Sequence, residues 1–343
     1  MTGDFFLTQW AFMGMRWLYE TLTNESIVLT VVISTLLIRC VTVLGDIKSR
    51  KSSMKMQLIQ PQLQRLQKKY QNDPQRLSIE QRKLMKDNNV SMMGGCLPML
   101  LTLPLFFIFI AAFRQWGNEM MVKLIVTMDA DPQAGLELFE NFKFLWVNNM
   151  WAADNGFKPV IQTAEEFFSV ANKKIPNLLY FVENPAALET FVRLGFFVPA
   201  EEGGYALVNL ATLTANDPTL ATAIQTKYDT LLAPCMELYA GKNNGWFIFP
   251  VLAAVTTFLH SWVMTKGQKK LQGDSETPDA AASTNKMMQW TMPIMSFYFC
   301  LVSNSTFALY WTVSNVFSLL SSLAINQYLG RMVPKAEEKG VQK

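Results

Sequence analysis

The chain has 343 residues, of which half are hydrophobic and 17% are charged, and its formal net charge is +3. Typical soluble domains contain about 25% charged residues, and they rarely need uninterrupted apolar runs of membrane-spanning length. The runs are continuous rather than alternating, which excludes a closed β-barrel. We therefore predict an all-α polytopic membrane protein with five spans. The apolar stretches are Ile27–Gly45, Leu97–Phe113, Trp246–Met264, Met287–Val302 and Thr306–Tyr328.

Residues 1–25 are rich in aromatic side chains, among them Phe6, Trp10 and Trp17. This composition predicts an amphipathic helix that lies in the outer membrane interface. A loose N-terminal tail is the alternative. Asp4 interrupts the start and no small-residue cleavage site follows an apolar core, so we do not expect a cleavable signal peptide.

The first span, residues 26–45, contains a single charge, Arg39. A charge at this depth costs at least ~2.5 kcal/mol, so it usually faces a cavity or a partner. On a helical period, Thr35, Arg39, Thr42 and Asp46 share one stripe, while Val28 and Val32 continue it as an apolar surface. We interpret this stripe as the wall of a groove that is open to water on the cytoplasmic side only.

Two simpler interpretations of the stripe remain open. The long side chain of Arg39 can extend to the nearer interface with no groove beside it. The hydroxyls of Thr35 and Thr42 can donate to carbonyls of their own helix, as hydroxyls in apolar helices commonly do.

The two largest loops have opposite charge. Residues 46–93 contain 11 Lys and Arg against 4 Asp and Glu, whereas residues 115–245 contain 8 against 15. The positive-inside rule then places 46–93 and the tail 329–343 in the cytoplasm, and the N-terminus outside. The basic segment can also contact anionic lipid headgroups or ribosomal RNA, but topological charge explains the same residues equally well.

Residues 46–93 are expected to form a cytoplasmic helical hairpin. Its first arm, Ile47–Asn72, is bent by Pro61, and Asp73 and Pro74 are typical of an N-cap and first helical residue for the second arm, which ends near Asn88. The apolar residues expected to pack the arms together are Leu58, Leu63, Leu66 and Tyr70 against Leu77, Leu84 and Met85.

The second span, residues 94–114, begins with paired glycines, should kink at Pro104, and has Thr102 as its only polar residue. Residues 115–245 form an acidic extracytoplasmic loop, with an inserted helical domain at about 160–242. The third span follows at 246–265, then a cytoplasmic loop at 266–286, and the fourth and fifth spans at 287–328. The run Met287–Val302 rises only about 24 Å, so this hairpin thins the bilayer unless flanking polar residues extend the span.

Side chains for catalysis or metal binding are scarce. Cys40, Cys96 and Cys300 lie in or beside spans and Cys235 lies outside, so no disulfide is expected. The lone His260 is interpreted as an interfacial residue. The sequence contains no cluster with metal-ligand spacing and no hydrolase or nucleotide motif, so we expect no enzyme, cofactor, metal or direct DNA binding.

The hairpin contains LIQPQLQRLQKKY, the second span GGCLPMLLTLPLFF, the third AVTTFL and the fifth FALYWTVSN. Together with the arginine of the first span, these segments resemble the YidC and Oxa-type membrane protein insertases. The resemblance covers about 26–115 and 246–330. It implies a five-helix core around a cytoplasm-facing hydrophilic groove, with Arg39 at its centre. The positions implied to line the groove or contact substrate are Thr35, Thr102 and Trp311, with Tyr310 and Asn315 nearby.

The sequence departs from the family pattern in two places. Thr102 replaces a longer polar residue, and some 80 residues are inserted after Phe144–Pro159, a segment similar to the family's short external loop. Large external domains of the family usually lie between an extra N-terminal span and the first core span instead. The insertion is therefore interpreted as unrelated to those domains.

The resemblance implies an insertase and chaperone for nascent membrane proteins in the bacterial cell membrane. The ribosome is an expected partner through the hairpin, and the Sec translocon is a further candidate. One alternative is a channel or transporter that uses Arg39 as an anion site, although the inverted repeats typical of transporters are not evident. Another is an assembly scaffold in which the external domain does the main work.

Overall fold

The computed structural model describes residues 6–88, 97–169, 172–201, 203–272 and 279–332. The chain divides into two compact units, which are described separately. The first unit comprises Met1–Val31, Ile108–Pro250 and Tyr298–Leu309. The second comprises Val32–Phe107, Val251–Phe297 and Tyr310–Lys343.

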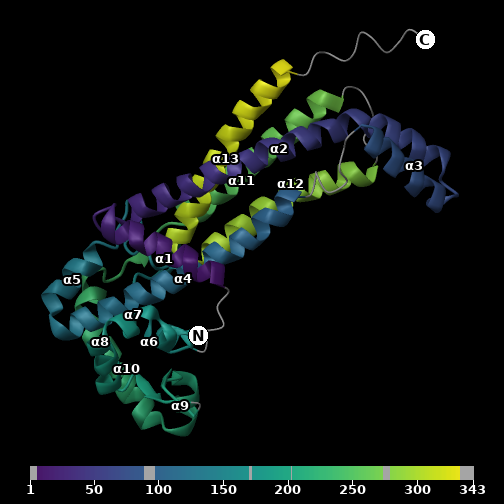
Figure 1. The fold of residues 1–343 in the computed structure, drawn as a ribbon. Helices are drawn as coiled ribbons and strands as arrows, with labels where there is room; N and C mark the ends of the chain where they lie inside the picture. Colours follow the sequence, from purple (N-terminus) through teal and green to yellow (C-terminus); the bar gives the residue numbers. More distant parts are fainter. Residues whose placement is uncertain (1–5, 89–96, 170–171, 202, 273–278, 333–343) are drawn as a thin grey trace. The chain divides into compact units, whose positions relative to one another are not determined.

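Five long helices contain the predicted spans (Figure 1). They are α2 (Ile27–Lys69), α4 (Leu97–Ala130), α11 (Ile248–Gln272), α12 (Asp279–Val302) and α13 (Ser305–Met332). Among the described residues, Ile27–Lys48, Ile248–Lys266 and Ser305–Ile325 are long and apolar enough to cross a membrane. The other two predicted spans include side chains outside the described residues, at 97–103 and at 287–288.

Two of these helices are longer than the apolar runs that predicted them. The α4 helix continues beyond position 114 to Ala130, because Trp116, Met120 and Leu124 extend a buried helical face and no proline interrupts it. The α12 helix has 24 residues because its polar segment from Asp279 is also helical. The helix itself is therefore not short, although its strictly apolar part is.

The remaining helices are shorter. In chain order they are α1 (Phe6–Thr21), α3 (Pro74–Asp87), α5 (Pro132–Glu140), α6 (Ala164–Phe167), α7 (Leu179–Glu183), α8 (Pro185–Leu194), α9 (Leu210–Asn216) and α10 (Pro218–Leu238), with a 3₁₀ turn at Ile175–Asn177. Two antiparallel ladders join them: β1 (Asn155–Pro159) pairs with β4 (Asn243–Asn244), and β2 (Phe197–Pro199) pairs with β3 (Tyr205–Leu207). The predicted helical insertion therefore also contains short strands.

The insertion in the first unit has its own aromatic core. The rings of Phe167 and Tyr228 stack at 5.3 Å, and Phe168 contacts Phe196 edge-on at 5.0 Å. The hydroxyl of fully buried Tyr228 donates to the carbonyl of Gln162 at 3.0 Å, which satisfies the one polar atom of this side chain. Helices α6 to α10 lie together in this part of the first unit (Figure 1).

The base of the insertion is organised around the fully buried carboxylate of Asp154. Its Oδ1 accepts the backbone N–H groups of Trp246 and Phe247 at 2.7 and 2.9 Å. Its Oδ2 accepts Phe249 N–H at 2.7 Å and the indole N–H of Trp146 at 3.1 Å. One side chain therefore satisfies the N–H groups of the two residues before α11 and that of Phe249 in its first turn, where no helical partner exists.

The turn between α12 and α13 is bonded to the external loop within the first unit. The N–H and hydroxyl groups of Ser305 donate to the carbonyl of Ala152, and those of Thr306 donate to the carbonyl of Met150. Both residues are fully buried. The polar turn between the fourth and fifth spans is thus a fixed attachment point.

In the second unit, the C-terminal part of α2 and helix α3 form the two arms of the hairpin (Figure 1). The N-cap prediction is confirmed, because Asp73 accepts the N–H of Arg76 at 3.0 Å and Pro74 begins α3. Ile59 and Leu63 are buried, and Leu84 and Met85 pack against them. Ile59 was not predicted as a packing residue, and the side chain of Leu58 lies outside the described residues.

Candidate functional site

Arg39 lies on α2 in the second unit and its side chain is half-buried. Its Nε donates to Ser314 Oγ of α13 at 2.7 Å, and Nη2 donates to the same hydroxyl. A guanidinium has five N–H donors, so this contact uses only part of its capacity. The predicted central arginine therefore has a polar partner on another membrane-spanning helix.

The neighbouring residues of the stripe differ in their environment. Thr35 is fully buried, whereas Thr42 and Asp46 are half-buried. The hydroxyl of Thr42 donates to the carbonyl of Arg39 at 3.2 Å, within its own helix. The contact of Thr42 is therefore the one expected from the simpler interpretation, in which its hydroxyl donates to a carbonyl of its own helix.

A chain of polar side chains joins α11, α12 and α13. The indole N–H of Trp311 donates to Ser296 Oγ at 2.5 Å, and the hydroxyl of Thr257 donates to the same oxygen at 3.1 Å. The amide of Asn315 donates to Thr257 Oγ1 at 2.8 Å. The structure thus brings Trp311 and Asn315 together through two hydroxyls from other helices.

Two further positions complete the predicted set. Tyr310 is buried, with 6% of its surface exposed. The side chain of Thr102 lies outside the described residues. Near its position on α4, the ring of Phe106 contacts Trp311 edge-on at 5.0 Å. Of the predicted residues, Arg39, Trp311 and Asn315 therefore have described polar or aromatic contacts between helices.

Sequence reasoning missed Ser314, Ser296 and Thr257, which link these residues. A signal was present in the fifth span, because Ser314, Ser318 and Ser322 recur every four residues and all three are buried. Ser322 Oγ lies 3.2 Å from His260 Nε2. The lone histidine thus has a hydroxyl partner on α13.

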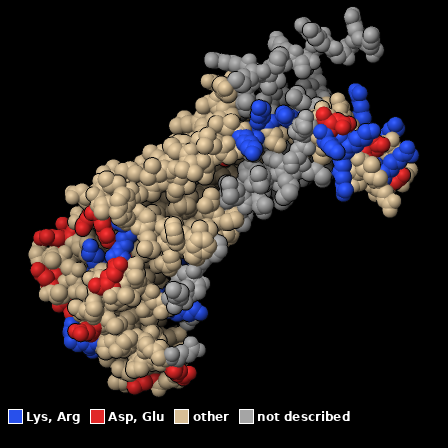
Figure 2. All heavy atoms as spheres, viewed as in Figure 1, with Lys and Arg blue, Asp and Glu red and all other residues tan. Residues whose placement is uncertain are grey.

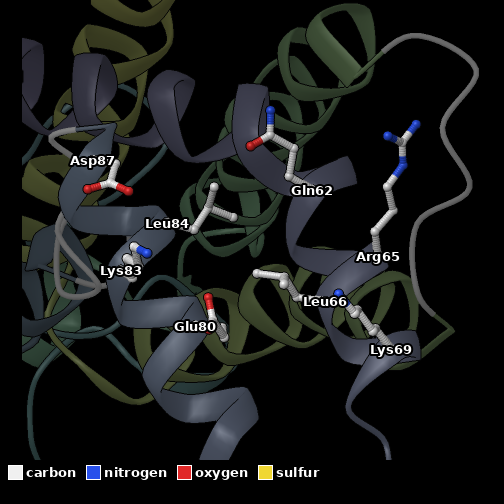
Figure 3. A pocket seen from close by; sticks show the side chains of 8 residues that line it. All are labelled: Gln62, Arg65, Leu66, Lys69, Glu80, Lys83, Leu84 and Asp87. Carbon is white, nitrogen blue, oxygen red and sulfur yellow. The ribbon is translucent and has the colours of Figure 1, made fainter.

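The hairpin contains a pocket of about 340 Å³ between its arms. Figure 3 shows Leu66 and Leu84 at its centre, with Gln62 and Arg65 along one arm and Lys83 along the other. In Figure 2, Lys and Arg predominate on the visible face of the hairpin. The pocket is open and charged, which is the character of a contact surface rather than of an enclosed ligand site.

The site is a cluster of polar side chains between helices, in which Ser296, Ser314 and Asn315 are buried. Its described side chains carry hydroxyls, an amide, an indole N–H and a guanidinium, and they lie in the apolar parts of α2, α11, α12 and α13. Within the part of the chain that the structure describes, no group of three or more His, Cys, Asp or Glu is placed to hold a metal ion.

A model of one protein family, the 60Kd inner membrane protein family, matches residues 17–332. The chain belongs to this family. This assignment confirms the resemblance to YidC and Oxa-type proteins and, with the apolar helices, the prediction of an all-α polytopic membrane protein. It also places the chain among bacterial inner membrane proteins.

Individual members of the family show the same similarity over part of the chain. A membrane protein insertase YidC of Clostridium perfringens is 35% identical over 143 residues, which are 41% of this chain and 52% of that protein. Those of Clostridium tetani and Wolinella succinogenes are 34% and 31% identical over 38% and 46% of this chain. The matches cover 50% and 25% of those two proteins, so the chain spans about half the length or less of these relatives.

Proposed function

We propose that this protein is a membrane protein insertase. It receives nascent membrane proteins in a hydrophilic groove that faces the cytoplasm, and it releases their transmembrane helices into the lipid bilayer. The observation that carries the proposal is the contact of Arg39 with Ser314, a charged group bound by a hydroxyl between two membrane-spanning helices. The names of the relatives support the same function.

The polar chain explains how such a groove lowers the barrier to insertion. Moving an unpaired amide or hydroxyl from water to an apolar medium costs roughly 2–7 kcal/mol. The guanidinium donors of Arg39 that Ser314 does not use replace part of the hydration of a translocating segment. Trp311 and Asn315, already bonded to Ser296 and Thr257, hold the helices around it in place. The cost that remains is offset by burial of the substrate's apolar helix in lipid and by the membrane potential, worth about 2.3 kcal/mol per charge per 100 mV.

The charged hairpin fits the entry side of this path. Lys69 and Arg76 lie over the ring of Tyr70 at the tip, at 5.3 and 5.4 Å, and leave cationic groups exposed there. A basic tip on the cytoplasmic side attracts ribosomal RNA and anionic headgroups. We assign the ribosome and nascent membrane proteins as partners, and the Sec translocon as a further one. The proposal includes a role in folding and assembly of the inserted proteins, and it requires no cofactor and no catalytic step.

Replacing Arg39 tests the proposal directly. In cells depleted of their own insertase, we expect Arg39→Ala to reduce several-fold the insertion of substrates whose translocated segments carry acidic residues. Arg39→Lys should retain more activity, because it keeps the charge while losing the planar fork of donors. Protease protection of a tagged substrate measures insertion.

Ser314→Ala is the matched variant, because it removes the hydroxyl partner and leaves the guanidinium in place. We expect a smaller loss than with Arg39→Ala. Full insertion of every substrate by Arg39→Ala at normal expression would contradict the proposal. In reconstituted vesicles, flux of a small anion without insertion of a test protein would assign the site to a channel or transporter.

A further inference from the structure

Four apolar side chains of the first unit lie on three chain segments that meet near the start of α11. Leu145 lies in the external loop, Phe157 on β1, and Trp246 and Phe247 just before the helix. Phe157, Trp246 and Leu145 are exposed over 87%, 75% and 62% of their surface. Phe247 is half-buried, and its ring lies 5.2 Å from that of Phe157. We call these four residues the interface anchor. A single exposed apolar side chain is common on protein surfaces. A contiguous group of them marks an interaction surface.

The bonds of Asp154 hold the chain segments of the anchor close together. Its carboxylate accepts the N–H groups of Trp246 and Phe247, and also the indole of Trp146, the residue that follows Leu145. The ring of Trp146 contacts that of Phe249 at 4.9 Å. Three chain segments, one with each exposed anchor residue, are therefore held together by one buried side chain and two aromatic pairs.

The backbone of the anchor adds an independent observation. Leu145 and Phe247 have φ angles of 52° and 61°, a conformation that bulky residues rarely adopt. The turn around Leu145 is fixed by reciprocal bonds between Phe144 and Val147, and the position of Phe247 is fixed by Asp154. Strained backbone persists only where its surroundings determine it, and it clusters at functional positions. Here the strain occurs at two of the four anchor residues.

We propose that the interface anchor inserts into the membrane–water interface at the start of α11 and binds phospholipid there. The candidate span Ile248–Lys266 begins one residue after Phe247, so the anchor is continuous with the lipid-facing part of the chain. Aromatic residues favour this depth because their rings are amphipathic. Exposed Lys143 and Lys242 lie two and four positions before Leu145 and Trp246, where they can meet headgroup phosphates.

This attachment has a consequence for the insertion. Phe157 of the anchor lies on β1, where the chain enters the inserted segment, and Trp246 follows β4, where the chain leaves it. Binding of these residues to lipid holds both ends of the inserted segment at one depth of the interface. The anchor is distinct from the Arg39 site, and its function does not depend on the proposed insertase activity.

Site-specific photo-crosslinking in vesicles tests the proposal. The photoreactive amino acid p-benzoylphenylalanine replaces Phe157 or Trp246 in the full chain, which is reconstituted in vesicles of phosphatidylcholine and phosphatidylglycerol. After illumination, mass spectrometry of the peptides detects lipid adducts. We expect phospholipid adducts at both positions, at a yield several-fold above the control.

The control carries the same photoreactive residue at Leu220 on α10, which is 48% exposed and belongs to the inserted domain. Unchanged thermal unfolding of each variant in detergent establishes that the fold is retained. Adduct yields at Phe157 and Trp246 no higher than at Leu220 would overturn the proposal. Crosslinks to a second copy of the chain or to another protein, in place of lipid, would also overturn it.

Discussion

Replacing Asp154 with asparagine is expected to destabilise the first unit by about 3 kcal/mol or more, because each buried donor left unpaired costs about 1–3 kcal/mol. The carboxylate accepts four N–H groups with two oxygens. Asparagine keeps one acceptor oxygen, but an NH2 group replaces the other. That group is a donor, so it cannot accept the two N–H groups that the lost oxygen bound. The side chains of aspartate and asparagine have nearly the same size and shape. The expected loss therefore comes from hydrogen bonding rather than from a cavity.

Asp131→Asn provides a matched control for the same chemical change. Asp131 accepts the N–H groups of Gln133 and Ala134 at the exposed N-terminus of α5, where asparagine caps about as well as aspartate. Thermal unfolding in detergent, followed by the reactivity of buried Cys235 and Cys300 with a thiol dye, measures the difference. Equal unfolding temperatures for the two variants would show that Asp154 is not the main constraint on this junction.

The same junction indicates why the sequence predicts some features and not others. The cap at Asp73 was predictable because donor and acceptor are three positions apart and the residue types are specific. The donors to Asp154 at Trp246 and Phe249 lie 92 and 95 positions away. Neither the sequence around Asp154 nor that around Trp246 indicates these hydrogen bonds. They form only because the folded insertion brings its two ends together.

The candidate site shows the same contrast. Arg39 was identified because a charge in an apolar run is costly wherever the helix packs. Its partner Ser314 lies 275 positions away and is one of many hydroxyls in the fifth span. Ser296, which joins Trp311 to Thr257, has no distinctive neighbours in the sequence. Composition therefore predicts which helix bears the charge, whereas helix packing determines which hydroxyl binds it.

Glu119 provides a second large effect, which depends on pH. It is buried on α4, outside the predicted span, and its Oε1 lies 3.4 Å from Arg16 Nε of α1. Its Oε2 has no hydrogen-bond partner among the described residues. Burial raises the pKa of Glu119 to about 7, and Glu183 and Glu20 add to the rise, while Arg16 and Lys123 oppose it.

The raised pKa of Glu119 determines how the stability of the protein changes with pH. Between the unfolded pKa of 4.5 and a folded value of about 7, the folded state retains a proton that the unfolded chain releases. The free energy of unfolding therefore falls as pH rises through this window, by roughly 3 kcal/mol in total. Glu119→Gln removes the ionisable group, so we expect it to unfold at a higher temperature than wild type at pH 8 and at nearly the same temperature at pH 4.5.

Glu20→Gln is the control, because Glu20 also pairs with Arg16, at 2.8 Å, but its side chain is 53% exposed. Exposed ion pairs contribute little, so this variant should shift the unfolding temperature only slightly at either pH. A lower unfolding temperature for Glu119→Gln at pH 8 would mean that the ionised pair with Arg16 outweighs the cost of burying the carboxylate. The pH dependence of the difference between Glu119→Gln and wild type thus measures directly which of the two opposing effects dominates where α1 meets α4.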